Sequence, residues 1–200
     1  MAKHLLIFAR HPALGLVKTR LAYTVGEAEA LRVYEELLDH TRAAADGVAA
    51  TKTLWLAGEP PLGPNAFTEW QAYEQRPQPT GELGERMHQA FGAAFAEGAT
   101  RCVIIGTDCP ELTSTHLEQA FAHLASHDVV VGPALDGGYY LLGMNTLIPD
   151  FFQNKAWSTD TVLADTLADA DRLGLRVAQL PPLSDVDTAS DLLAWQSRRG

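Results

Sequence analysis

Cysteine is scarce in this sequence, and its two cysteines are not spaced for a disulfide bridge or a metal. Cys102 and Cys109 lack C-x-x-C spacing and have no histidine neighbours at the intervals of a zinc site. Neither a disulfide framework nor a zinc site is therefore indicated. The low cysteine content favours a reducing compartment, and we expect a cytoplasmic protein.

Long hydrophobic runs are absent as well. The first apolar run covers residues 5–9 and ends at Arg10. It is too short for the core of a signal peptide and far shorter than a membrane span. We interpret it as a buried strand, and we expect no integral membrane contact.

Positive charge is in deficit, because 15 Lys and Arg residues stand against 25 Asp and Glu residues, a formal net charge of -10. This balance disfavours binding to the phosphate backbone of nucleic acids or to anionic lipid. An anionic small molecule would have to be held by a local group of cations. The hydrolase motif G-x-S-x-G and the zincin motif H-E-x-x-H are also missing, so those enzyme classes have no support.

The composition and periodicity are those of a globular α/β protein. Hydrophobic residues make up 46% of the chain and charged residues 20%, and short apolar runs alternate with segments of helical period. We expect strands at residues 4–9, 51–57, 101–106, 128–132, 139–144 and 175–180. Helices are expected at residues 27–46, 83–94, 160–173 and from Thr188, and another after a cap at Thr113 or Thr115, with Thr115 and Glu118 as its capping box. Residues 60–81 are expected to be irregular, and residues 1–200 to form one α/β domain with a mixed, mainly parallel sheet flanked by helices.

The loop after the first strand concentrates positive charge in this acidic chain. Arg10, Lys18 and Arg20 lie close together in sequence, at the carboxyl end of a strand, where open α/β sheets bind ligands. Gly15 would let the backbone approach a ligand, and the cations would pair with phosphate oxygens. The loop is neither a Walker loop nor a G-x-G-x-x-G motif. A solvated surface turn is the alternative.

A carboxylate follows the strongest expected central strand, in the segment Gly106-Thr107-Asp108-Cys109-Pro110. Asp108 in a turn stiffened by proline is suited to a hard divalent cation, and Mg²⁺ or Mn²⁺ typically bridges such carboxylates to substrate phosphates. The alternative is that Asp108 only hydrogen-bonds its own turn.

Two further carboxylates, Asp185 and Asp187, alternate on an extended stretch before the last helix. They would repel each other unless a positive group lay between them, and a metal shared with Asp108 would supply it. The alternative is helix capping by Asp187 or Thr188, with Asp191 in the first turn favouring the helix dipole.

The segment from Gly132 to Tyr140 contains Asp136-Gly137-Gly138 between two expected strands. It reads equally well as a tight turn or as a ligand-binding loop in which Asp136 offers a carboxylate and the tyrosines offer a stacking face and a hydroxyl. Further on, Ser158 or Thr159 is expected to cap the next helix, and stacking by Trp157 on a base or sugar is the weaker alternative.

Six motifs in this order resemble those of one family. They are F-A-R-x-P-x-x-G-x-V-K-T-R-L from Phe8, G-E-L-G-E-R-M from Gly81, G-T-D-C-P from Gly106, G-P-A-x-D-G-G-Y-Y from Gly132, W-S-T from Trp157 and D-V-D-T-x-x-D-L from Asp185. The combination resembles the bacterial GT-A-like transferases labelled rSAM/selenodomain-associated transferase 1, in the nucleotide-diphospho-sugar transferase superfamily. The resemblance implies a Rossmann-like GT-A fold that binds a nucleotide at the carboxyl ends of its early strands.

The resemblance also implies roles for particular residues. The phosphate-binding set would be Arg10, Gly15, Lys18, Arg20, Gly84 and Arg86. The metal set would be Asp108, Asp185 and Asp187, holding Mg²⁺ or Mn²⁺. The second substrate would face Asp136, Gly137, Gly138, Tyr139 and Trp157, with Asp136 and Lys18 as the catalytic residues.

One departure from the sugar-transferring enzymes affects the expected chemistry. Those enzymes commonly carry Asp-x-Asp at the metal strand, whereas here only Asp108 is acidic. A single carboxylate there also resembles the nucleotidyltransferases of this fold. We expect a metal-dependent transferase that uses a nucleotide sugar and a small-molecule acceptor. Transfer of a nucleotidyl group from a nucleoside triphosphate to a phosphorylated acceptor is the alternative, and a non-enzymatic nucleotide-binding module is the third. The oligomeric state stays open, with a homodimer as one arrangement.

Overall fold

The protein, described by a computed structural model for residues 2–58 and 67–198, is built on a seven-stranded sheet with the strand order β3-β2-β1-β4-β6-β5-β7. The strands are β1 (Lys3–Arg10), β2 (Thr51–Ala57), β3 (Glu74–Pro77), β4 (Arg101–Ile105), β5 (Val129–Pro133), β6 (Tyr139–Met144) and β7 (Val177–Gln179). All neighbouring strands are parallel except those that pair with β6. The expected mixed, mainly parallel α/β sheet is thus confirmed.

Helices cover both faces of this sheet. They are α1 (Thr19–Val25), α2 (Glu27–Asp46), α3 (Leu83–Ala96), α4 (Ser114–His123), α5 (Val162–Arg172) and α6 (Ala189–Ser197), with 3₁₀ turns η1 (Thr68–Trp70) and η2 (Pro149–Phe152). Side chains alternate along β1, so Leu5 and Ile7 join the core under α2 and α4, while Leu6 joins the core under α3 and α5. This alternation is the period of a strand buried on both faces.

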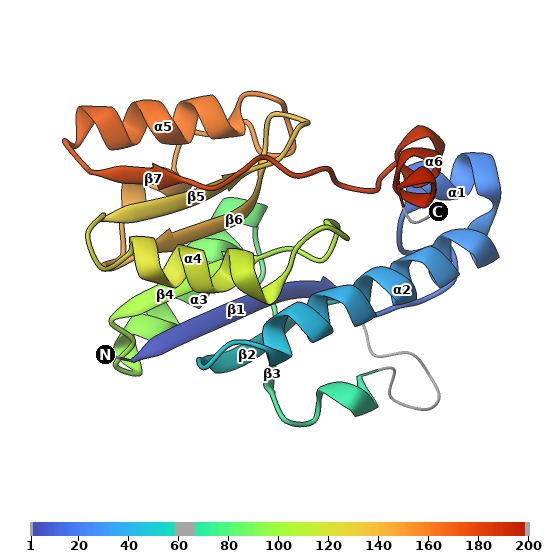
Figure 1. The fold of residues 1–200 in the computed structure, drawn as a ribbon, viewed down its shortest axis with the longest axis horizontal. Coiled ribbons are helices and arrows are strands. Elements are labelled where there is room, and N and C mark those ends of the chain that lie inside the picture. The colour runs from blue at the N-terminus through green and yellow to red at the C-terminus, as the bar shows by residue number, and fades with distance from the viewer. Residues whose placement is uncertain (1, 59–66, 199–200) are drawn as a thin grey trace.

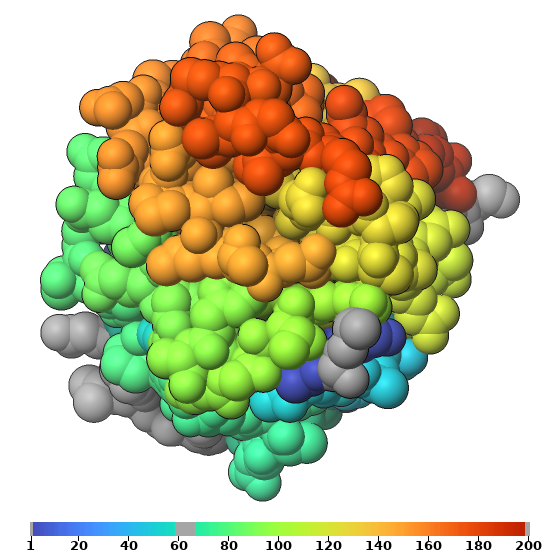
Figure 2. Space-filling view, turned by 90° about the vertical axis from the view of Figure 1, so that its left-hand side faces the viewer, coloured from blue at the N-terminus to red at the C-terminus, as the bar shows by residue number. Residues whose placement is uncertain are grey.

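A third apolar cluster joins α1 and α6 to the first half of α2. Its fully buried members include Leu21 and Leu37, with Trp195 from α6 almost as deeply buried. Figure 1 shows α1 and α6 side by side at the end of the molecule toward which β1 points. Figure 2 shows the opposite end, covered by the segments around α3 (green), α4 (yellow) and α5 (orange).

The order in which strands are added to the sheet reverses between β1 and β4. From β1 the chain adds β2 and β3 on one side, and then returns to place β4 on the other side of β1. In open α/β sheets, ligands bind at the carboxyl ends of the strands at such a switch point. The fold therefore directs attention to the segments that follow β1 and β4.

Several expected elements match the structure closely, and others do not. The observed bounds of α2, β2 and β6 are those expected from the sequence. The expectation of irregular structure at residues 60–81 falls partly on residues 59–66, which lie outside the described residues, and is wrong for η1 and β3. β3 has only four residues and ends at Pro77, so it forms mainly because β2 offers it an edge.

The first residues of two helices differ from those that the sequence predicts. The capping box of α4 joins Thr113 and His116, not Thr115 and Glu118, because Thr113 is the residue with extended backbone before the first turn. Neither Ser158 nor Thr159 caps α5, whose N-cap is Thr161. Ser158 has a positive φ of 63° and the Thr159 hydroxyl donates to the Ala156 carbonyl, so both residues shape the turn before the helix.

Helix α1 was not expected at all. It is seven residues long, and its N-cap is Lys18, whose backbone is left-handed with φ 48° and makes no side-chain cap. Such a start carries none of the usual capping signals. Among the described helices, none combines the length and apolarity needed to cross a membrane.

Two glycines of α3 provide a test of this packing. A Cβ at Gly84 would lie 2.5 Å from three indole atoms of Trp157, whereas a Cβ at Gly92 would meet nothing closer than 3.8 Å. We expect Gly84→Ala to lower the free energy of unfolding by about 1–3 kcal/mol through overpacking. Gly92→Ala should raise it by about 0.5–1 kcal/mol through helix propensity. Urea unfolding of both variants measures the difference, and equal stability of the two would contradict the close approach of Trp157 to α3.

Candidate functional site

A cleft of about 760 Å³ opens at the carboxyl ends of β1 and β4. Its size is in the range that holds nucleotides and other small-molecule ligands. Among the residues proposed from the sequence, those that line it are the cations Arg10, Lys18, Arg20 and Arg86, the carboxylates Asp108, Asp136, Asp185 and Asp187, and Gly138, Tyr139 and Trp157. The cleft thus brings together segments that are far apart in the chain.

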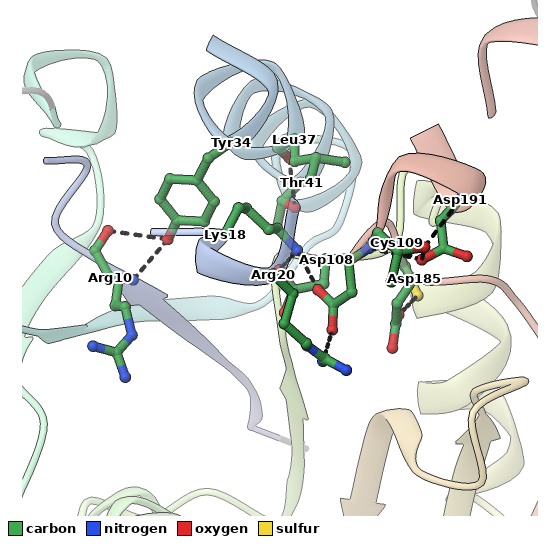
Figure 3. A network of polar contacts seen from close by, with 12 residues as sticks. Arg10, Lys18, Arg20, Tyr34, Leu37, Thr41, Asp108, Cys109, Asp185 and Asp191 are labelled. Atoms are coloured by element: carbon green, nitrogen blue, oxygen red, sulfur yellow. Dashed lines mark hydrogen bonds and ion pairs between the residues drawn. The ribbon is translucent and has the colours of Figure 1, made fainter. Parts of the chain in front are cut away.

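Lys18 lies at the centre of the polar network. Its ammonium donates to Asp108 and also to Asp187, the latter at 2.8 Å, and only 5% of its side chain is exposed. Burial lowers the pKa of Lys18. The two carboxylates together raise it by more than burial lowers it, so the net shift is upward. Lys18 is therefore a charged group held by two carboxylates. Figure 3 shows it close to Asp108 and Arg20.

The left-handed backbone at Lys18 aims this side chain. A positive φ is uncommon for a residue other than glycine, and it persists where the surrounding structure imposes it. Here the residue ends the loop from β1 and starts α1. Its ion pairs with the β4 loop and with the stretch before α6 join three separate parts of the chain.

Arg20 and Arg10 are more accessible than Lys18. Arg20 pairs with Asp187, although 72% of its side chain is exposed. The backbone of Arg10 is held by Tyr34, whose hydroxyl accepts from its N–H at 2.7 Å and donates to its carbonyl at 3.0 Å. Figure 3 shows the Arg10 guanidinium pointing away from Tyr34, and it pairs with no carboxylate among the described residues. The sequence does not predict this role for Tyr34, because its spacing is that of the apolar stripe of α2.

Arg86 is positioned by Gln78, another residue missed in the sequence. The Gln78 amide nitrogen donates to the carbonyls of Ala9 and Trp55, both at 3.2 Å, and its oxygen accepts from Arg86 at 3.5 Å. Arg86 also donates through Nε to the Gly81 carbonyl at 2.7 Å. Gln78 thus ties the ends of β1 and β2 to the guanidinium that faces the cleft. No sequence motif marks it, since its role depends on β3 being beside β2.

Asp185 is the most perturbed carboxyl group of the site. It accepts a hydrogen bond from the Cys109 thiol. Burial raises its pKa to about 6, and the negative charges of Asp108, Asp136 and Asp187 raise it too, against the lowering effect of the thiol. Several carboxylates therefore share one negative field, which is typical of functional sites. Burial also raises the pKa of the Cys109 thiol, which is consistent with its role as a hydrogen-bond donor to Asp185.

The second wall of the cleft comes from the β5–β6 turn and the segment before α5. Asp136 is exposed, and its Oδ1 accepts from the Gly138 N–H at 2.9 Å. This bond confirms the expected tight turn without excluding a ligand, because Oδ2 has no protein donor among the described residues. The hydroxyl of Tyr139 is buried and has no hydrogen-bond partner among those residues, whereas Tyr140 donates to the Pro181 carbonyl and belongs to the core.

Three glycines proposed for the site do not line the cleft. A Cβ at Gly137, which has φ 91°, would lie 2.2 Å from the Asp160 carbonyl oxygen, so the turn can approach the segment before α5 only with glycine there. Gly84 supports Trp157, as described above, and Gly15 has a positive φ beside Glu27. These glycines therefore affect the site indirectly, by allowing close packing or the backbone conformation of the segments that line it.

The remaining carboxylate of the last motif, Asp191, caps α6. Its Oδ2 accepts from the Thr188 N–H at 2.8 Å, and Thr188 accepts from the Asp191 N–H in return. The capping interpretation is confirmed for Thr188 and Asp191, while Asp185 and Asp187 face the cleft. In the described part of the chain, no three His, Cys, Asp or Glu side chains are grouped so that they could hold a metal ion.

Comparison with solved structures identifies the class of fold. A protein from Desulfovibrio desulfuricans G20, described as a "putative nucleotide-diphospho-sugar transferase", is similar over 100% of this chain and 89% of its own, with 31% identity and a TM-score of 0.91. The inositol-1-phosphate CTP transferase from T. maritima shares the fold at 11% identity and a TM-score of 0.60, over 95% of this chain and 91% of its own. The glucosyl-3-phosphoglycerate synthase from Mycobacterium tuberculosis, solved with Mn²⁺, UDP and phosphoglyceric acid, shares it at 13% identity and a TM-score of 0.54, over 98% and 75%. The architecture is that of the nucleotide-diphospho-sugar transferases.

The family can also be stated. Residues 40–159 match the family described as "Uncharacterized protein conserved in bacteria (DUF2064)", and the chain belongs to it. A search of curated proteins finds no match.

The raised pKa of Asp185 predicts a specific dependence of stability on pH. Between an unfolded pKa of 3.8 and a folded pKa of about 6, the folded state binds more protons, so the stability of the wild type falls as pH rises through this window. Asp185→Asn keeps an acceptor for Cys109 and removes the charge. At pH 7 it should be about 1–3 kcal/mol more stable than the wild type, and below pH 4 the two should be equal.

Urea unfolding in EDTA at several pH values measures this difference. Asp171→Asn, at an exposed position on α5, is the matched control for the loss of one carboxylate. A constant difference for Asp185→Asn would show that Asp185 is not perturbed.

Proposed function

We propose that this protein is a metal-dependent transferase that uses a nucleotide-activated sugar, as in the narrower selenodomain-associated group that its motifs resemble. One observation carries the proposal: a cationic loop and four carboxylates meet in one cleft at the β1/β4 switch point. A cleft with both kinds of charge suits a diphosphate together with a divalent cation. The fold is shared with both glycosyltransferases and nucleotidyltransferases.

The diphosphate would be bound by the cations at the β1 side of the cleft. Arg86 is held through its Nε and one terminal nitrogen, which leaves further N–H groups for a ligand. Arg10 approaches the cleft on a backbone fixed by Tyr34. Planar guanidinium groups bind phosphate oxygens in a bidentate manner, and their fixed backbones reduce the entropy lost on binding.

The carboxylates fit a divalent cation that is completed by substrate. Asp108 is 46% exposed along its side chain and contacts Lys18 through Oδ1, whereas Asp187 is 29% exposed and contacts Lys18 through Oδ1 and the exposed Arg20 through Oδ2. Mg²⁺ and Mn²⁺ commonly take one or two protein carboxylates and fill the remaining positions with phosphate and water. Asp108 and Asp187 would hold the ion, with Asp185 behind them. When bound, the ion would stabilise negative charge on the departing diphosphate.

On the opposite side, Asp136 would orient an acceptor hydroxyl and take its proton. The turn bond to Gly138 fixes one carboxylate oxygen and leaves the other for the acceptor. Lys18 would supply positive charge near the phosphates throughout the reaction, because its pKa is raised and it does not lose its proton near neutral pH.

Nucleotidyl transfer to a phosphorylated acceptor is the second candidate. It is favoured by the single acidic residue of Gly106-Thr107-Asp108, where sugar-transferring enzymes commonly carry two. A binding module without turnover is the third candidate, and Asp136 argues against it, because a simple nucleotide binder has no need of a carboxylate on the far wall.

The reaction products separate these candidates. We expect a screen of nucleotide sugars with Mn²⁺ and pooled acceptors to release a nucleoside diphosphate. Release of pyrophosphate from a nucleoside triphosphate, with no nucleoside diphosphate in any combination, would refute sugar transfer and support nucleotidyl transfer.

Asp108→Asn tests the proposed metal site without chemistry. Replacing a ligating carboxylate should weaken Mn²⁺-dependent nucleotide binding by at least ~10–100-fold, since even indirect partners of metal ligands have effects of this size. Calorimetric titration of UDP, GDP, CDP and ADP with and without Mn²⁺ measures it. Metal-dependent binding that survives the substitution unchanged would remove Asp108 from the metal role.

Arg10→Gln and Arg86→Gln test the phosphate contacts. A charge-assisted hydrogen bond contributes about 1.5–3 kcal/mol, so each substitution should weaken nucleoside diphosphate binding by ~10–100-fold. Arg32→Gln is the control, because Arg32 pairs with Glu29 and Glu36 on the surface of α2 and should leave affinity unchanged. If all three variants bound nucleoside diphosphate with the same affinity, neither Arg10 nor Arg86 would contact the phosphates.

A further inference from the structure

Charge is divided unevenly between the two walls of the cleft. The first wall, formed by the loop after β1, α1 and the start of α3, carries all four cations that line the cleft among the described residues. The second wall is formed by the turn at residues 136–140 and by residues 157–162, and we name it the acceptor wall. Its cleft-lining residues include the charged Asp136 and are otherwise neutral.

Three described cations close to the acceptor wall in sequence or in the same cleft are engaged by carboxylates. Lys155, just before this segment in sequence, has a side chain only 2% exposed and is paired with Asp169 at 2.6 Å. Lys18 is held by Asp108 and Asp187, and Arg20 is held by Asp187. Arg10 and Arg86 pair with no carboxylate among the described residues, but they belong to the first wall, where the proposed function assigns them to the diphosphate.

The charged side chain that lines the acceptor wall among the described residues is negative. Asp136 is exposed there, and its Oδ1 accepts from the Gly138 N–H at 2.9 Å. An anionic group placed beside it would meet a like charge, which is unfavourable. The same wall offers groups that suit a neutral molecule, namely the aromatic rings of Tyr139 and Trp157 and the exposed side chains of Ser158 and Thr159.

We infer that the acceptor is an uncharged, hydroxyl-bearing molecule that carries no phosphate or carboxylate, bound on the acceptor wall beside Asp136. This inference rests on the proposed function and names its second substrate class. In the transfer step, the acceptor oxygen forms a bond to the anomeric carbon of the sugar. The bond from that carbon to the diphosphate oxygen breaks, the nucleoside diphosphate leaves with the electron pair, and the hydroxyl proton passes to Asp136.

Fractionation by charge tests the inference before the acceptor is known. A bacterial metabolite extract is separated into molecules retained by an anion exchanger and molecules that pass both anion and cation exchangers. Each fraction is incubated with the protein, Mn²⁺ and a panel of nucleotide sugars, and nucleoside diphosphate release is measured. We expect at least ~10-fold more release with the neutral fraction. Release with the anionic fraction alone, or with neither fraction while nucleotide still binds, would overturn the inference.

A designed cation on the acceptor wall provides a second test by binding alone. Ser158→Lys adds a charge at an exposed position of the wall, and Ser158→Gln adds comparable length without charge. With the nucleotide site filled by a nucleoside diphosphate and Mn²⁺, inorganic phosphate should bind Ser158→Lys at least ~10-fold more tightly than the wild type by calorimetric titration. Ser158→Gln should match the wild type.

Phosphate binding to the wild type as tight as to Ser158→Lys would overturn the inference, because the wall would then already hold an anion. Failure of the nucleoside diphosphate to bind at all would instead refute the proposed function. The two failures are thus distinguishable in the same titration series.

Discussion

The contact of the Lys18 ammonium with Asp108 and Asp187 is the interaction on which the cleft depends. It joins the start of α1 to the loop after β4 and to the stretch before α6, and the Val186 N–H adds a backbone bond to the Asp108 carbonyl at 2.9 Å. Without the ammonium, several carboxylates would face one another in a partly buried space, which is electrostatically unfavourable. The left-handed backbone of Lys18 is the local cost of placing one cation where it contacts both carboxylates.

This arrangement gives the two sides of the cleft different chemical character. Lys18 offsets two of the carboxylates, while Arg10 and Arg86 keep guanidinium groups toward the cleft on backbones held by Tyr34 and by Gln78. Across the cleft, Asp136 stands among neutral and aromatic groups. The electrostatic field of the protein would thus direct a charged donor to the cationic side of the cleft and leave the other side for an uncharged acceptor.

Sequence and structure agree best where a signal is local. The apolar period of α2 and the compact runs of β2 and β6 predicted their bounds, because each element buries a regular stripe or face. They disagree at α1, at β3 and at the caps of α4 and α5. A seven-residue helix with a lysine cap and a four-residue strand ending in proline form through their neighbours more than through their own propensities.

For the site, the sequence by itself determined which charged residues follow strands and are candidates for chemistry, since residue type and position after an apolar run are local properties. Only the tertiary structure decided how they combine. It placed Lys18 between carboxylates 90 and 169 residues away in sequence. It brought Gln78 into contact with Arg86 and assigned Asp191 to a helix cap. Gly84 and Gly137 do not line the cleft and instead support the segments that do. These outcomes depend on strand order and on the approach of distant segments, and electrostatic interactions act through space irrespective of separation along the chain.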